Sequence, residues 1–448
     1  MSMIKSIASD RLAILFMVMM VASAGNTAFQ SILPSIASEL KINDVWISIA
    51  FSWSALLWVI LAPKWARMSD RRGRKMLMKI GTWGFILSMA LTGLTLWLGI
   101  AGLISSMAAF ILFAIFRSIY GALGSAAPPA VQAYVAARTD RSERAGAMAL
   151  LASSFGLGTV IGPAIAHYLI FEPLGLVGPM VIFAGAGLLL VIALQFRLPN
   201  DEPKFEVKGI VGSYPSSAGE LPRRQDGDDD DDDQVAGIGA DAPQAHAETQ
   251  KPSAPVSVRL PIRDPRLLPW VTAGLIGGHA HAAMMGVIGF LVRDRLGLAD
   301  DPSAAVQAIG SVMFIGAMAT LLAQWGLIPI LSMKPRASVL WGGIAALVGV
   351  AVVAVSRDFY GISFGYAISS LGFGLFRPGF TAGASLAVRQ SEQGDVAGKV
   401  ASINGSAYIF APAVTVALFN WHEPAAFVLI FVALISLLLW GRGALIDD

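Results

Sequence analysis

The chain of 448 residues contains no cysteine, and only 14% of its residues are charged. Without cysteine it can form no disulfide, no thiolate nucleophile and no cysteine-based metal site. Soluble domains carry about 25% charged residues, whereas here 55% of residues are hydrophobic and the mean hydropathy is +0.66. A chain of this composition is expected to lie within a lipid bilayer. The net charge is only +2 and the basic residues are spread over loops, so we expect no nucleic-acid partner.

Sequence signatures of enzymes are also absent. The chain has no Gly-x-x-x-x-Gly-Lys-[Ser/Thr] loop for ATP, no Gly-x-Ser-x-Gly and no His-Glu-x-x-His. We therefore expect no enzyme activity, no cofactor and no metal site. The run Asp228 to Asp233 lacks the glycine-punctuated spacing of a calcium loop, so a solvated acidic linker is the better interpretation.

Apolar runs long enough to cross a membrane, which takes about 20 residues, account for most of the chain. They are 12–33, 45–65, 76–98, 104–136, 145–170, 175–197, 266–292, 304–332, 337–356, 360–388, 397–420 and 423–441. Residues 199–265 are rich in Pro, Gly, Ser and Ala and are expected to be disordered. The sequence thus predicts a first bundle over 1–198, a cytoplasmic linker over 199–265, a second bundle over 266–441 and a cytoplasmic tail over 442–448.

Positive charges are distributed unequally between the predicted loops. With both termini inside, the outer loops hold only Lys41, Arg293, Arg295 and Arg357. The inner loops and termini hold seventeen basic residues: Lys5, Arg11, Lys64, Arg67, Arg71, Arg72, Arg74, Lys75, Lys79, Arg138, Arg141, Arg144, Lys334, Arg336, Arg389, Lys399 and Arg442. Because positively charged loops stay in the cytoplasm, both termini are expected on the cytoplasmic side of the cytoplasmic (inner) membrane. We also expect the protein to be a monomer.

A weak internal repeat relates the two predicted bundles. At an offset of about 251 residues, Gly121 corresponds to Gly372 and Arg138 to Arg389. Two like-built halves joined by a polar linker are typical of transporters whose cargo site lies at the repeat interface. The expected partners are therefore the lipid bilayer, a small-molecule cargo and protons.

A basic turn joins the second and third runs, with the sequence Ala-Arg-Met-Ser-Asp-Arg-Arg-Gly-Arg-Lys over residues 66–75. It resembles the loop between helices two and three of the major facilitator superfamily, whose pattern is Gly-x-Leu-Ala-Asp-Arg-x-Gly-Arg-Lys. The matching positions are Asp70, Arg71, Gly73, Arg74 and Lys75, whereas Ala66 and Met68 depart from the pattern. The alternative is a solvated loop that only sets topology.

This resemblance implies an all-α membrane protein with the major facilitator fold, 12 transmembrane helices in two six-helix bundles. It also implies that the five matching residues of the turn latch one side of the transporter in one conformational state.

Arg117 lies deep inside the fourth run, four residues before Gly121. A deep cation is a candidate functional residue and should face a water-filled cavity. The stretch is similar to the family's fourth-span motif, in which an Arg four residues before a Gly is linked to proton transfer. The alternative is an Arg that binds helix-end carbonyls.

The fifth run contains Gly158, Gly162 and Pro163. The two glycines share one helix face and allow a close helix contact, and the proline kinks the helix. The stretch resembles the family's antiporter signature, Gly-x-x-x-Gly-Pro, of its exporting branches. We expect these residues to shape the moving contact between the halves, with generic helix packing as the alternative.

Other polar residues in the runs are candidates for the cargo or proton path. Arg377 is a second buried cation. The alternative is that it lies close enough to the inner end of its run for the guanidinium to reach the membrane surface. Asn26 and Gln30, four apart in the first run, are expected on one helix face. His281, two residues after His279, could titrate near neutral pH. We find no aspartate or glutamate in the middle of any run.

Together these features predict a proton-linked exporter of small amphipathic organic molecules that works by alternating access. Cations without a carboxylate favour an anionic or neutral cargo, such as a drug or a siderophore-like metabolite. Two alternatives stay open: an importer or facilitator of an organic anion, and a non-transporting sensor or assembly factor on the same fold.

Overall fold

The computed structural model describes residues 7, 9–139, 141–199, 260–389 and 392–446. Helices make up nearly all of this part of the chain. The first group is α1 (Ser9–Leu40), α2 (Asp44–Arg72), α3 (Arg74–Ile100), α4 (Ser106–Leu123), η1 (Gly124–Ala126), α5 (Ala127–Ala136), α6 (Arg141–Ala166), η2 (His167–Leu169) and α7 (Gly178–Arg197). The second is α8 (Leu268–Arg295), α9 (Pro302–Leu321), the π-helical segment η3 (Leu322–Leu327), α10 (Ile328–Ile330), α11 (Pro335–Val355), α12 (Phe359–Leu386), α13 (Gln393–Trp421) and α14 (Glu423–Ala444).

Twelve helical segments in the described residues are long and apolar enough to cross a membrane, which confirms the prediction of twelve spans. Residues 106–136 and 302–330 each form one span from consecutive helices. Polar caps define several ends: Ser105, Asp301 and Asp358 accept hydrogen bonds from backbone N–H groups in the first turn of α4, α9 and α12. These caps satisfy donors that have no partner within the helix.

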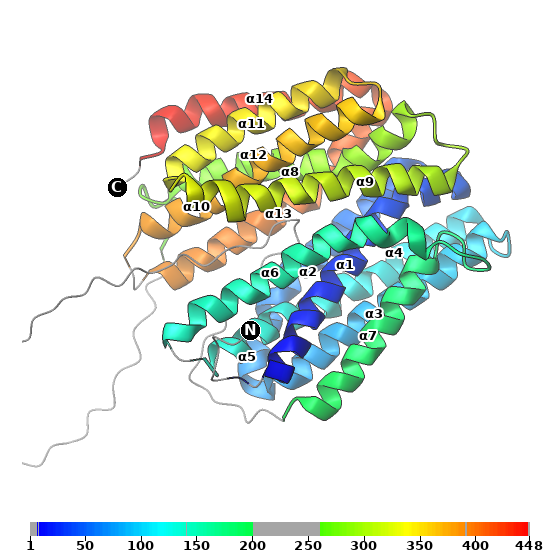
Figure 1. Cartoon of the computed structure of the whole chain (residues 1–448), viewed down its shortest axis with the longest axis horizontal. Coiled ribbons are helices and arrows are strands. Elements are labelled where there is room, and N and C mark those ends of the chain that lie inside the picture. The colour runs from blue at the N-terminus through cyan, green and yellow to red at the C-terminus, as the bar shows by residue number, and fades with distance from the viewer. Residues whose placement is uncertain (1–6, 8, 140, 200–259, 390–391, 447–448) are drawn as a thin grey trace, which may run out of the picture.

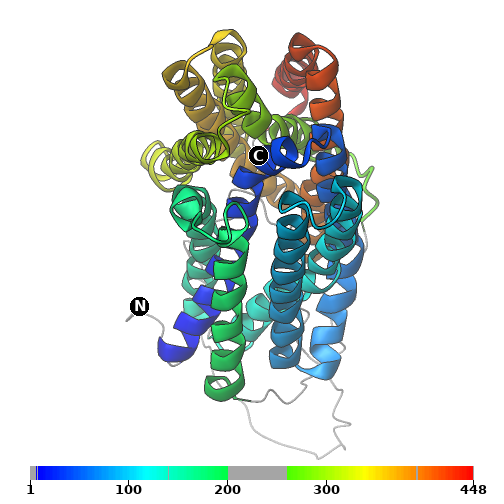
Figure 2. The same cartoon turned by 90° about the vertical axis from the view of Figure 1, so that its right-hand side faces the viewer.

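The helices form two bundles that lie one above the other (Figure 1). We call α1–α7 the N-lobe and α8–α14 the C-lobe. Figure 2, turned by 90°, shows the same separation, with the blue end of α1 reaching the C-lobe helices. Across the lobe boundary α6 runs beside α9, and Val160 packs on Ala317 and Leu321 there.

Arg295, the last residue of α8, forms hydrogen bonds with the end of α11 and the start of α14 in the C-lobe. Its guanidinium donates to the carbonyl of Ala354 at 3.0 Å, just before α11 ends, and to Ser356 at 2.6 Å. Its Nε donates to Glu423, the first residue of α14, at 2.9 Å. The last carbonyls of a helix need such donors, and Arg295 supplies them at the end of α11 while it also binds the start of α14.

The described end of the linker docks on the C-lobe. Leu260 is buried, and its N–H donates to Asp395 Oδ2 at 3.0 Å. Arg266 binds Asp264 at 2.9 Å and Glu392 at 3.1 Å, and its hydrogen bond lowers the pKa of the Glu392 carboxyl. Packing on the C-lobe thus begins at Leu260, within the last residues of the stretch 199–265 that the sequence predicts as a linker. Asp228 to Asp233 lie outside the described residues.

A candidate cargo site between the lobes

Polar contacts join the lobes at the end where α1 finishes and α2 begins, which we call the α1–α2 end. Arg293 of α8 donates two hydrogen bonds to Asp44 of α2, at 3.0 and 2.8 Å, and one to the carbonyl of Pro34 at 2.9 Å. Asp44 and Arg293 are each only 7% exposed. Because both charges are buried and bridge the lobes, separating the lobes here requires breaking a buried ion pair.

Two further hydrogen bonds reinforce this end. Ser35 of α1 donates to the carbonyl of Pro302 at the start of α9, at 3.3 Å. Asn420 near the end of α13 donates to Asn43 at 3.3 Å. The lobes are thus closed against each other at the α1–α2 end in this structure.

A cavity of about 660 Å³ lies between the lobes beside these contacts. The residues that line it come from α1, α2, α8, α9 and α13: Gln30, Leu33, Pro34, Ile47, Ser48, Phe51, Ala282, Met285, Gly286, Gly289, Phe290, Met313, Tyr408 and Pro412. None of these lining residues carries a formal charge, so the wall suits an uncharged, largely apolar molecule.

The structure separates Asn26 from Gln30. Gln30 lines the cavity, whereas Asn26 is 1% exposed and accepts a hydrogen bond from Arg117 inside the N-lobe. Residues four apart share a helix face but lie about 6 Å apart along the axis. That separation places the two amides in different surroundings, so their predicted role in one cargo or proton path stays a prediction.

Arg117 is enclosed by the N-lobe and is 0% exposed. Its guanidinium carbon lies 4.4 Å from the ring centre of Phe51, 4.6 Å from Tyr120 and 5.4 Å from Phe29. A desolvated cation over aromatic faces gains about 2 kcal/mol from each favourable contact. The expectation that Arg117 faces a water-filled cavity is thus wrong for this structure, because three rings and Asn26 replace water around it.

Arg377 and His281 lie in the C-lobe, away from the lining of the cavity. Arg377 of α12 is 4% exposed, and the His281 ring stacks on Phe373 with ring centres 4.6 Å apart. His279 forms a hydrogen bond to the carbonyl of Leu275 in its own helix, at 2.7 Å. The two histidines thus face different surroundings, as their spacing predicts.

The glycines of the fifth span pack inside the N-lobe. A Cβ atom on Gly158 would lie 2.3 Å from the Met20 carbonyl, and one on Gly162 would lie 2.2 Å from the Ala24 carbonyl. The face they share therefore contacts α1 inside the N-lobe, and the expectation that these glycines shape the moving contact between the halves stays a prediction. Pro163 does lie at that contact, because a Cβ on Gly310 of α9 would be 2.5 Å from its carbonyl.

Gly121 allows a similar approach between α4 and α2. A Cβ atom there would lie 2.3 Å from the carbonyl of Ser54, whose hydroxyl donates to the carbonyl of Arg117 at 3.2 Å. Gly121 thus helps to position the helix turn that carries Arg117.

Substituting Gly162 with alanine is expected to destabilise the protein by about 1–3 kcal/mol, because the added methyl group forces α6 away from the α1 backbone. Thermal unfolding of the purified protein, followed by intrinsic fluorescence, measures the loss. Gly185→Ala on α7 is the matched control, since a Cβ there meets nothing within 4 Å. Equal unfolding temperatures for the two variants would contradict the close-packing argument.

The turn between α2 and α3 is a single residue. Gly73 has φ 90°, a backbone conformation that favours glycine. Arg74 and Lys75 are buried, and Lys75 Nζ donates to the Gln195 carbonyl near the end of α7 at 2.9 Å. The side chains of Asp70 and Arg71 lie outside the described part of the chain, so the predicted latch stays a prediction.

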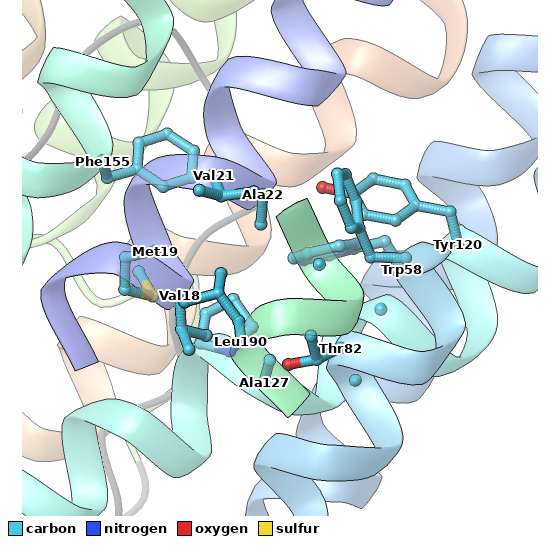
Figure 3. A pocket seen from close by; sticks show the side chains of 15 residues that line it. Val18, Met19, Val21, Ala22, Trp58, Thr82, Tyr120, Ala127, Phe155 and Leu190 are labelled. Carbon is cyan, nitrogen blue, oxygen red and sulfur yellow. The ribbon is translucent and has the colours of Figure 1, made fainter. Parts of the chain in front are cut away.

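A second pocket, of about 450 Å³, lies inside the N-lobe rather than between the lobes. Figure 3 shows the Trp58 and Tyr120 rings side by side on one wall and Phe155 on the opposite one. Val18 and Leu190 also line it, and none of its lining residues is an acid, a histidine or a cation. This pocket is therefore lined mainly by apolar and aromatic side chains and carries no formal charge.

Asp44 and Arg293 are the functional candidates that sequence reasoning missed. Each stands at the end of an apolar run, where a charged residue is ordinary. They are 249 residues apart, so no local pattern pairs them.

Comparison with known proteins agrees with this fold. A family model described as the Major Facilitator Superfamily matches residues 15–412. The multidrug resistance protein MdtG of Proteus mirabilis is 27% identical over 191 residues, 40% of this chain and 43% of that protein. The staphyloferrin B transporter of Staphylococcus aureus is 25% identical over 166 residues, 36% of this chain and 37% of that protein. The chain thus matches less than half the length of each of these two relatives.

Solved structures resemble the whole chain. The human organic anion transporter MFSD10 (TETRAN) has a TM-score of 0.59 at 16% identity, covering 98% of this chain and all of that one. An inward-facing, unoccupied bacterial homologue of the human lysosomal transporter Spinster has a TM-score of 0.65 at 12% identity, covering 97% and 94%. At these identities the structures establish the fold alone. Because the family model spans nearly the whole chain, the protein belongs to the Major Facilitator Superfamily and is an integral membrane protein.

Proposed function

We propose that the protein exports small amphipathic organic molecules across the cytoplasmic membrane in exchange for protons, by alternating access of the cavity between the lobes. The observation that carries the proposal is that cavity, of about 660 Å³ and lined by both lobes. Aromatic and methionine side chains in its wall adapt to varied apolar shapes. A small rotation of one lobe against the other would change which end of the cavity is open.

Two sequence-level observations support export. The relatives that match part of the chain include a protein named for multidrug resistance and one named as a staphyloferrin B transporter. The Gly158, Gly162 and Pro163 stretch resembles the antiporter signature of exporting branches. Because positively charged loops favour the cytoplasmic side, we propose that the Gly73 turn and both termini are cytoplasmic. Asp70, Arg71, Gly73, Arg74 and Lys75 would then latch that side when the cavity opens outward.

The wall of the cavity narrows the expected cargo. Neither Arg117 nor Arg377 is among its lining residues, so neither would contact an anionic group of the cargo there. A neutral amphipathic molecule fits this wall better than an anionic metabolite. Arg117, Asn26, His281 and Arg377 are then proposed to act in proton coupling or in positioning the helices, and Gln30 to contact the cargo.

An export assay tests the proposal. Cells that express the protein should accumulate less of an uncharged amphipathic dye than cells with an empty vector, and a protonophore should abolish the difference. Greater accumulation in the expressing cells would instead support the importer. No change for cationic, neutral and anionic dyes, repeated in vesicles with an imposed proton gradient, would support the non-transporting sensor.

A further inference from the structure

The two walls of the cavity between the lobes differ in chemistry. The N-lobe wall carries Gln30 of α1 and Ser48 of α2. The C-lobe wall is formed by Met285, Phe290, Met313 and small or apolar neighbours, with Tyr408 as its polar residue. Tyr408 Oη donates to the sulfur of Met285 at 3.7 Å. The wall that offers an amide is therefore on the N-lobe, facing a largely apolar wall on the C-lobe.

Gln30 is available to a ligand. Its side chain forms no hydrogen bond with any residue that the structure describes, and it borders the cavity. The Gln30 side chain is half-buried, and none of its amide atoms is buried without a hydrogen-bond partner. Its two N–H donors and its carbonyl acceptor are therefore free to exchange water for a hydrogen-bonding group of a bound molecule.

The surroundings of the cavity disfavour an ionic cargo of either sign. The Arg117 guanidinium carbon lies 4.4 Å from the ring centre of Phe51, which lines the cavity, so a cation bound against that ring would lie close to a positive charge. An anion would find no cationic lining residue to pair with. At the α1–α2 end the charge of Arg293 is matched by Asp44 at 2.8 Å, so this pair attracts neither sign.

From this geometry, and resting on the proposed transport function, we propose that Gln30 is the specificity-determining residue of the cavity and that the cargo is uncharged. Such a cargo carries a hydrogen-bonding group, which Gln30 binds with support from Ser48, on an apolar body that contacts Phe290, Met285 and Met313. Because the amide both donates and accepts, arylamines, amides, ketones and alcohols all satisfy it while staying uncharged. The cavity is thus expected to discriminate between molecules mainly by their charge rather than by their shape.

Binding of matched fluorescent probes to the full-length protein in nanodiscs tests this inference. N-phenyl-1-naphthylamine is uncharged and has one N–H donor, and 8-anilinonaphthalene-1-sulfonate adds a sulfonate to the same ring system. Ethidium is the cationic probe. We expect the uncharged probe to bind at least about tenfold more tightly than either ion, since a buried unpaired charge is strongly disfavoured. Nanodiscs without protein give the lipid background.

Variants of Gln30 separate its role from general hydrophobicity. Gln30→Leu should weaken the uncharged probe about fivefold through loss of one hydrogen bond. Gln30→Glu should strengthen ethidium binding by about tenfold, because it adds a carboxylate to an uncharged wall. Gln307→Leu on the exposed face of α9 makes the same chemical change outside the cavity lining and should leave all three affinities unchanged.

Two results would overturn the inference: tighter binding of the sulfonate than of the uncharged probe, or unchanged binding of the uncharged probe in Gln30→Leu. Failure of the proposed function gives a different pattern. In that case the uncharged probe binds and depends on Gln30, but proteoliposomes under a proton gradient do not move it.

Discussion

Replacing Asp44 with alanine is expected to open the α1–α2 end of the protein to solvent. The substitution leaves the Arg293 guanidinium, which is 7% exposed, without the carboxylate that bridges the lobes. Removing one partner of a buried ion pair costs about 3–5 kcal/mol, and the lobes relieve this cost by separating so that water reaches Arg293. Since about 1.4 kcal/mol is a tenfold change in an equilibrium, even half of the cost shifts the open population more than tenfold.

The absence of cysteine makes this shift directly measurable. Ser48→Cys places a single thiol in the wall of the cavity, close to the ion pair along α2. Purified protein is labelled with a maleimide reagent, and the labelling rate is compared with and without Asp44→Ala. We expect labelling to be at least about tenfold faster in the Asp44→Ala background, in line with the population shift.

Asp294 provides a matched control for this experiment. It accepts a hydrogen bond from the Nε of Arg293 at 2.6 Å, but it belongs to the same lobe and its side chain is 39% exposed. Asp294→Ala should therefore leave the labelling rate near that of the parent. The double variant Asp44→Ala with Arg293→Met removes both charges and should label more slowly than Asp44→Ala alone. A labelling rate that does not respond to Asp44→Ala would show that the pair does not hold the lobes together.

Replacing Arg117 with methionine is expected to reduce transport at least about tenfold, because a buried intramembrane cation is retained chiefly for function. Arg117 lies directly behind Phe51, which lines the cavity, so its loss changes the electrostatic potential at the cargo wall. Proton-driven uptake of the uncharged dye into inverted vesicles measures the effect.

Stability measurements distinguish this functional role from a structural one. In Arg117→Met the carbonyl of Asn26 loses its buried donor, which costs about 1–3 kcal/mol. Replacing both partners, in Arg117→Met with Asn26→Leu, leaves no unpaired polar group and should restore much of the unfolding temperature. If transport recovers together with stability in the double variant, Arg117 serves packing alone and the functional assignment is wrong.

The amphipathic and apolar patterns of the chain determine most of its secondary structure. Twelve long apolar runs must become helices in a bilayer, because a helix satisfies all of its backbone hydrogen-bonding groups within one segment. The runs at 45–65 and 76–98 match α2 and α3, and Gly73 marks the single residue between those helices. The beginning of the C-lobe was less predictable, because it depends on contacts between distant parts of the chain. The Leu260 N–H binds Asp395, and Arg266 binds Glu392.

The sequence by itself determined the membrane location, the number of spans and the candidates Arg117 and Gln30, because hydropathy, turn residues and deep polar groups are local properties. Only the tertiary structure decided what those residues face: Gln30 borders the cavity, while Asn26 and Arg117 bind each other behind it. It alone revealed the pairing of Asp44 with Arg293, 249 residues apart. The physical reason is that the surroundings of a side chain depend on which helices pack against it, and that packing is set by contacts between distant parts of the chain.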